Sequence, residues 1–142
     1  MRTGAGKTLI AAIICKYWQA KRCGEKFKAL FLVPTRHLAE QQCLAFENVF
    51  VRTDLQEIDE SMNERSIVHS LQTNSILFLT PQKLVNTLKT TNLKLFDLNA
   101  IVFDEAHHTA DDHPYNKIMS VYFNEKRAGG GLKRGPLILG KF

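Results

Sequence analysis

Short runs of apolar residues alternate along this chain with segments in which apolar residues recur every three or four positions. The runs are Ala29–Val33, Ser75–Leu79, Ala100–Phe103 and Pro136–Leu139. Apolar runs of four or five residues without polar alternation are typical of strands buried on both faces of a parallel sheet. We therefore predict four buried strands.

The segments between the runs predict helices. We expect one from just after Thr8 to the basic pair Lys21-Arg22, and others over Arg36 to about Phe46, Gln82–Lys89 and Pro114–Lys126. In the first helix, cations at the carbonyl end and Gly24 beyond them are stop signals. The pattern from 49 to 74 is weaker, and there we expect a short strand within 51–58 and a helix over 61–71.

Strands that alternate with helices indicate an α/β fold, in which helices cover both faces of a mostly parallel sheet. The chain has 142 residues, of which 44% are hydrophobic, enough for one domain with a core of its own. There is no internal repeat and no long linker. We predict a single domain over residues 1–142.

Charge and cysteines narrow the function classes only slightly. The net charge of +5 is compatible with a polyanionic partner, although many domains without such a partner are as basic. Cys15, Cys23 and Cys43 are odd in number and have no metal-site spacing, which argues against a disulfide framework or a zinc site.

The sequence has no apolar run of roughly 18 residues and no apolar signal region. We expect a protein of the cytoplasm or nucleus.

A candidate phosphate-binding loop lies near the start of the chain, over Thr3-Gly4-Ala5-Gly6-Lys7-Thr8. Small residues allow successive backbone N–H groups to converge on a phosphate at the positive end of a helix. Lys7 would reach the β- and γ-phosphates, and the Thr8 hydroxyl would complete a Mg²⁺ shell. The simpler alternative is a glycine turn that caps an ordinary helix. No strand precedes the loop, so we expect the sheet to lack a strand that would normally fill its centre.

Two acidic residues strengthen the prediction that the loop binds a nucleotide. Asp104 and Glu105 follow a buried strand, at the carboxyl edge of a parallel sheet where ligands bind. One carboxylate can hold Mg²⁺ and the next can polarise a water molecule for attack on the γ-phosphate. Loop and acids together predict an ATP or GTP site. The neighbouring His107 and His108 have no third ligand spaced nearby, so we do not expect them to form a metal site.

These residues carry a family resemblance. The form Thr-Gly-x-Gly-Lys-Thr at the loop and Asp104-Glu105-Ala106-His107 resemble the first RecA-like domain of superfamily 2 helicases. Val33-Pro34-Thr35-Arg36 with Gln41-Gln42 is similar to motif Ia of that superfamily, and Thr80-Pro81-Gln82 to motif Ib. The resemblance implies a RecA-like P-loop NTPase fold, a three-layer sandwich whose sheet here lacks the strand before the loop.

The resemblance is closest to the branch of RIG-I-like receptors and Dicer-related helicases. Its most specific part is 104–119, which includes His113-Pro114-Tyr115-Asn116. Ala106 stands where the branch usually has Cys, so the box reads DEAH. After Gly140 the chain reads Lys141-Phe142, where the family continues into a Leu-Thr-Ala-Ser-like motif III. We expect a fragment of a helicase that lacks the second RecA-like domain.

The resemblance also implies a cofactor, a partner and roles for single residues. The cofactors would be ATP and Mg²⁺, and the partner double-stranded RNA. The implied residues are Lys7 and Glu105 for catalysis, Thr3, Gly4, Ala5, Gly6, Lys7, Thr8, Asp104 and His107 for the nucleotide, Thr8 and Asp104 for Mg²⁺, and Thr35, Arg36, Gln41, Thr80, Pro81 and Gln82 for nucleic acid. Without the resemblance, pairing of Arg36 with Glu40 one helical turn later explains Arg36 equally well.

Three functions remain open on the sequence. The first is the ATP-binding half of a RIG-I-like, antiviral RNA helicase or translocase in the cytoplasm. The second is a non-catalytic, truncated module that binds nucleic acid or another protein. The third is a fragment of a Dicer-type helicase or of a DNA-directed relative of the Fanconi anaemia M type. In the first case we expect the chain alone to bind ATP weakly and not to unwind duplexes, because a second domain supplies the arginines that stabilise the transition state.

Overall fold

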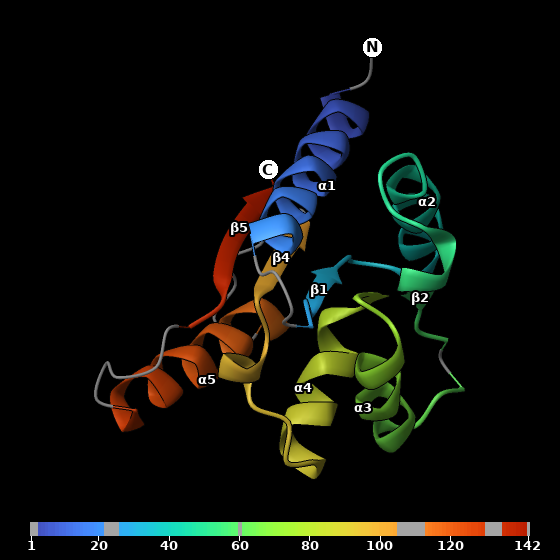
Figure 1. Cartoon of the computed structure of the whole chain (residues 1–142). Helices are drawn as coiled ribbons and strands as arrows, with labels where there is room; N and C mark the ends of the chain where they lie inside the picture. Colours follow the sequence, from blue (N-terminus) through green and yellow to red (C-terminus); the bar gives the residue numbers. More distant parts are fainter. Residues whose placement is uncertain (1–2, 22–25, 60, 105–112, 130–134, 142) are drawn as a thin grey trace.

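A five-stranded parallel sheet forms the middle layer of this computed structural model, which describes residues 3–21, 26–59, 61–104, 113–129 and 135–141 (Figure 1). The strand order is β2-β3-β1-β4-β5, and all neighbours run parallel. The strands are β1 (Ala29–Leu32), β2 (Leu55–Glu57), β3 (Ile76–Leu79), β4 (Ala100–Asp104) and β5 (Leu137–Lys141).

Helices cover both faces of the sheet. One face carries α1 (Thr3–Lys21) and α2 (Arg36–Phe46), and the other carries α3 (Glu64–Thr73), α4 (Pro81–Thr90) and α5 (Pro114–Ala128) (Figure 1). Two short 3₁₀ turns, Arg52–Asp54 and Leu95–Asp97, precede β2 and β4. This is the three-layer α/β sandwich that the alternation predicts. No helix in the described part of the chain has the length and apolar character needed to cross a membrane.

The two cores differ in character. On the α1–α2 side, Phe46 packs edge-to-face on Phe31 and Phe78, with ring centroids 5.3 and 5.0 Å apart, and all three side chains are fully buried. The opposite side is mainly aliphatic, with Leu and Ile side chains of the strands against α3, α4 and α5. Side chains at successive strand positions enter opposite cores, which explains why the strand sequences are continuously apolar.

The predicted strands are confirmed, and the weak region contains the short strand and the helix expected there, as β2 and α3. The predicted α/β class with a mostly parallel sheet is confirmed, and the five described strands are contiguous, with β4 paired directly to β5.

The first helix starts earlier than predicted, and small side chains form its buried face. It begins at Thr3 rather than after Thr8. Its buried face consists of Ala11, Ala12 and Cys15, while larger apolar residues remain exposed. These small side chains belong to the core on this side of the sheet. The exposed residues of this helix are Leu9, Ile10, Ile13 and Tyr17.

We predict that Phe46→Ala lowers the free energy of unfolding by about 3–5 kcal/mol, because it opens a cavity at the centre of the phenylalanine cluster. Urea denaturation followed by circular dichroism would measure the change. Leu44→Ala is the matched control on the same helix: Leu44 is 62% exposed, and its truncation should change stability by less than about 0.5 kcal/mol. Equal losses in the two variants would contradict this view of the core.

Candidate nucleotide and nucleic-acid site

The sheet brings the predicted segments to one edge. Leu79, Leu32 and Phe103 lie side by side in the register of β3, β1 and β4. The segments that follow them therefore leave the sheet at neighbouring points: Thr80 after β3, Thr35 after β1 and Asp104 at the end of β4. In an open parallel sheet this carboxyl edge is where ligands bind.

Asp104 is held firmly at this edge. It is only 4% exposed, and its main-chain carbonyl accepts a short hydrogen bond from the hydroxyl of Tyr115 on α5. The same hydroxyl lies 3.5 Å from the carbonyl oxygen of Leu32. The Tyr115 ring packs edge-to-face on Phe103, with centroids 5.1 Å apart. Tyr115 thus links the carboxyl ends of β1 and β4 to α5.

No structural role for the Tyr115 hydroxyl was predicted from the sequence. The available signal was the residue type, because a buried tyrosine usually finds a hydrogen-bond partner for its hydroxyl. The helix itself starts at a proline, and the Nδ1 atom of His113 accepts a hydrogen bond from the backbone N–H of Tyr115 at 3.2 Å. This cap fixes the first turn of α5, which carries Tyr115.

Thr3–Thr8 form the first turns of α1 rather than a separate loop. The N-terminal end of α1 lies at the end of the molecule to which β5 points (Figure 1). The first four N–H groups of a helix have no partner within it, and the helix dipole favours anions there. A helical backbone aims these groups along its axis instead of wrapping them around a phosphate. Glu105 and His107, also predicted for the site, lie outside the described residues.

Arg36 is paired with two carboxylates. Its Nη1 atom lies 3.1 Å from Glu40 Oε1, one turn later in α2, and its Nη2 atom lies 3.5 Å from Asp59 Oδ2, beyond β2. The pairing with Glu40 is the alternative that the sequence offered. Thr35 caps α2, since its hydroxyl accepts a hydrogen bond from the N–H of Leu38. The exposed Gln41 pairs with His37, at 3.2 Å.

The Thr80 segment begins α4. Thr80 occupies the capping position, but its side chain makes no capping hydrogen bond. Pro81 is buried at the first helical position, and the exposed Gln82 donates to Asn86 Oδ1 at 2.9 Å. The Thr80 hydroxyl and the outer face of Gln82 therefore border the same edge as Thr35 and Arg36.

The buried cysteines are not reactive centres. Burial raises the pKa of the Cys15 thiol to about 12 and that of Cys43 to about 11, so both remain protonated at neutral pH. A protonated thiol is a poor nucleophile and a poor metal ligand. Across the described ranges, no three His, Cys, Asp or Glu side chains gather as a metal site would require.

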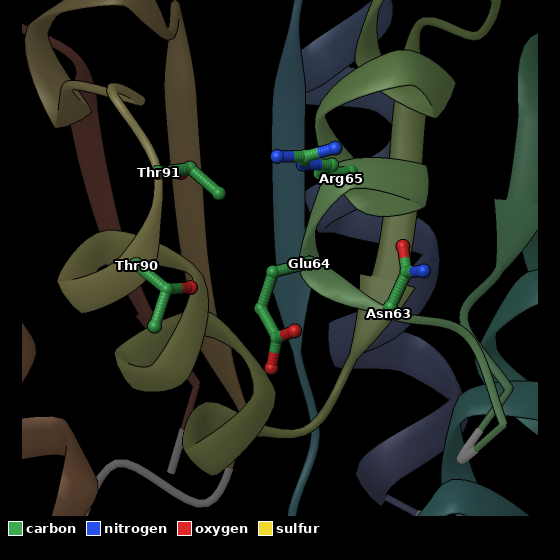
Figure 2. A pocket seen from close by; sticks show the side chains of 5 residues that line it. All are labelled: Asn63, Glu64, Arg65, Thr90 and Thr91. Carbon is green, nitrogen blue, oxygen red and sulfur yellow. The ribbon is translucent and has the colours of Figure 1, made fainter.

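A polar cavity of about 350 Å³ lies away from these residues, between the first turn of α3 and the end of α4 (Figure 2). Three of its lining residues use their side-chain oxygens within the helices: Asn63 caps α3, and the hydroxyls of Thr90 and Thr91 donate to carbonyls one turn earlier. Its lining residues are Asn63, Glu64, Arg65, Thr90 and Thr91. None of the predicted site residues lines it.

Similarity to known proteins covers nearly the whole chain. The family model described as type III restriction enzyme, res subunit, matches residues 1–128. The human antiviral innate immune response receptor RIG-I is 37% identical over 142 residues, which cover 95% of this chain and 15% of that protein. Dicer-like protein 2-2 of Aspergillus niger is 34% identical over 140 residues, which cover 99% and 10%.

Among solved structures, the helicase domain of Pyrococcus furiosus Hef superimposes with a TM-score of 0.80 at 28% identity, over 98% of this chain and 28% of that one. The chain thus spans only a small part of each of these relatives.

We predict that Tyr115→Phe lowers the free energy of unfolding by about 1–3 kcal/mol, because it removes the hydroxyl that donates to the buried main-chain carbonyl of Asp104. Urea denaturation would measure this. Tyr122→Phe is the matched control on α5, since the Tyr122 hydroxyl has no hydrogen bond to the described part of the chain and its loss should be nearly neutral. If both variants were equally stable, the Tyr115 hydroxyl would have no role in holding this edge.

Proposed function

The chain belongs to the type III restriction enzyme res-subunit family, as a RecA-like domain of superfamily 2 helicases, and on that basis we propose that it is the ATP-binding part of a helicase or translocase that acts on double-stranded RNA. The observation that carries the proposal is the placing of Asp104, Arg36 and Thr80 after adjacent strands at one sheet edge. A nucleotide and a nucleic-acid backbone bound there would be close enough for one to influence the other.

ATP would bind between the N-terminal end of α1 and the end of β4. Lys7 would hold the β- and γ-phosphates, and Thr8 and Asp104 would hold Mg²⁺, because hydroxyl and carboxylate oxygens are the ligands that this ion prefers. When bound, the ion neutralises charge on the phosphates. Glu105 would orient and deprotonate the attacking water. The small residues Gly4, Ala5 and Gly6 would leave room for the phosphates, and His107 would contact the nucleotide.

The nucleic acid would cross the ends of β1 and β3. Thr35, Arg36 and Gln41 from one segment, and Thr80 and Gln82 from the other, offer hydroxyl, guanidinium and amide groups for sugar and phosphate oxygens. Such contacts do not read sequence. Buried Pro81 would fix the backbone of the second segment. Recognition by shape and 2′-hydroxyl is the usual mode for duplex RNA. The proposed setting is an antiviral response in the cytoplasm; the name of the human receptor RIG-I refers to an antiviral innate immune response.

We expect the 142-residue chain to bind ATP-Mg²⁺ weakly and not to unwind duplexes, because an arginine from a second domain is worth about 10³–10⁵ in rate in related systems. Lys7→Ala should weaken nucleotide binding about ten- to a hundredfold, as expected for a lost charged hydrogen bond. Isothermal titration calorimetry would measure it. Lys89→Ala, a change of an exposed lysine on α4, is the control. Unchanged binding in Lys7→Ala would contradict the proposed nucleotide site.

We also expect duplex RNA to bind more tightly than duplex DNA of the same length and sequence, because only RNA presents the 2′-hydroxyl. Fluorescence anisotropy at one fixed salt concentration would compare them, since phosphate contacts make both affinities depend on salt. Equal or tighter binding of DNA would instead favour a DNA-directed helicase.

A further inference from the structure

Arg36 occupies an electrostatically unfavourable position. It is the first residue of α2, where the helix dipole repels cations, and the first turn of α2 contains no acidic residue. Its charge is offset instead by Glu40 and Asp59, at 3.1 and 3.5 Å. A cation at a helix N-terminus, beside backbone N–H groups, is an arrangement that suits a bound anion better than it suits helix stability.

The two ion pairs leave part of the hydrogen-bonding capacity of the Arg36 guanidinium unused. Each terminal nitrogen meets a single carboxylate oxygen from a different residue, so neither pair has the two parallel hydrogen bonds of a strong arginine–carboxylate contact. The Nε atom of Arg36 is buried and has no hydrogen-bond partner in the described part of the chain. An unsatisfied buried donor costs free energy. A phosphate at this helix end would accept from the terminal nitrogens in place of the two carboxylates, and could do so from both at once.

The ion pairs are also accessible and therefore exchangeable. The side chains of Arg36, Glu40 and Asp59 are 40, 42 and 52% exposed. Exposed pairs contribute only about 0.2–1 kcal/mol. Asp59 is oriented by its own turn, because its Oδ1 atom accepts a hydrogen bond from the N–H of Ser61 at 3.1 Å. Arg36 can leave Asp59 without disturbing the position of that carboxylate.

We propose that Glu40 and Asp59 act as positioning residues that hold Arg36 in a latch, which a nucleic-acid phosphate opens when it binds at the N-terminal end of α2. This inference rests on the proposed function of the edge. In the chain without nucleic acid, Arg36 pairs with the two carboxylates. In the complex, Arg36 pairs with the phosphate instead. Nucleic acid must break the ion pairs in order to bind, and this costs free energy. A chain that lacks the carboxylates therefore binds nucleic acid more tightly.

The test is a double-mutant cycle on the 142-residue chain, with duplex RNA binding measured by anisotropy over a range of salt concentrations. Glu40→Gln and Asp59→Asn should each tighten binding about two- to fivefold, the equivalent of one exposed ion pair. Arg36→Gln should weaken binding and reduce the slope of log K against log salt by about one phosphate contact. In the Arg36→Gln background, neither carboxylate change should have any further effect.

Glu47→Gln is the matched control, because Glu47 also pairs with an arginine, Arg52, at 2.7 Å, but near the other end of α2. A gain with Glu47→Gln equal to that with Asp59→Asn, or a gain that persists without Arg36, would reduce the effect to overall charge and overturn the latch. If Arg36→Gln lost affinity but the carboxylate variants showed no gain, the latch would be overturned and the proposed function would stand. Failure of the unaltered chain to bind RNA would overturn the proposed function, and the latch with it. Thermal unfolding confirms that each variant is folded.

Discussion

The structure depends on the burial of a parallel sheet on both faces. Four of its strands are short and apolar, and β1, β3 and β4 are buried at every position. A sheet of this kind is stable only if helices cover each face, because its side chains point alternately into both cores. The phenylalanine cluster around Phe46 and the aliphatic core beneath α3, α4 and α5 are the two results. Neither layer can be removed without exposing apolar strands.

The same constraint creates the site. Parallel strands in register end at one edge, so polar residues that follow different strands meet there although they are far apart in sequence. Tyr115 strengthens this edge by bonding the main-chain carbonyl of Asp104 from a helix on the aliphatic side. The helix that presents Arg36 packs on the other side. Both faces of the sandwich therefore take part in shaping one edge, at which we propose that a nucleotide and a nucleic acid bind.

Some features could be predicted because they follow from local pattern. Continuous apolar runs identified β1, β3, β4 and β5, and periodicity identified the helices between them. Other features could not. The start of α1 was misplaced because Gly4 and Gly6 fit a loop or a helix, and sequence does not decide between them. The buried face of α1 could not be chosen from the pattern, because apolar residues of both sizes recur at helical spacing, and the structure buries Ala12 and exposes Leu9 and Ile13.

By itself the sequence determined the α/β class, the residues that carry the helicase resemblance and the strand ends at which they occur, because these depend on spacing along the chain. Only the tertiary structure decided the strand order, the contact of Tyr115 with Asp104 and the pairing of Arg36 with Asp59. These features join segments that are distant in sequence. Their partners are set by the order in which strands pair and by the direction in which helices pack, and no local pattern records either.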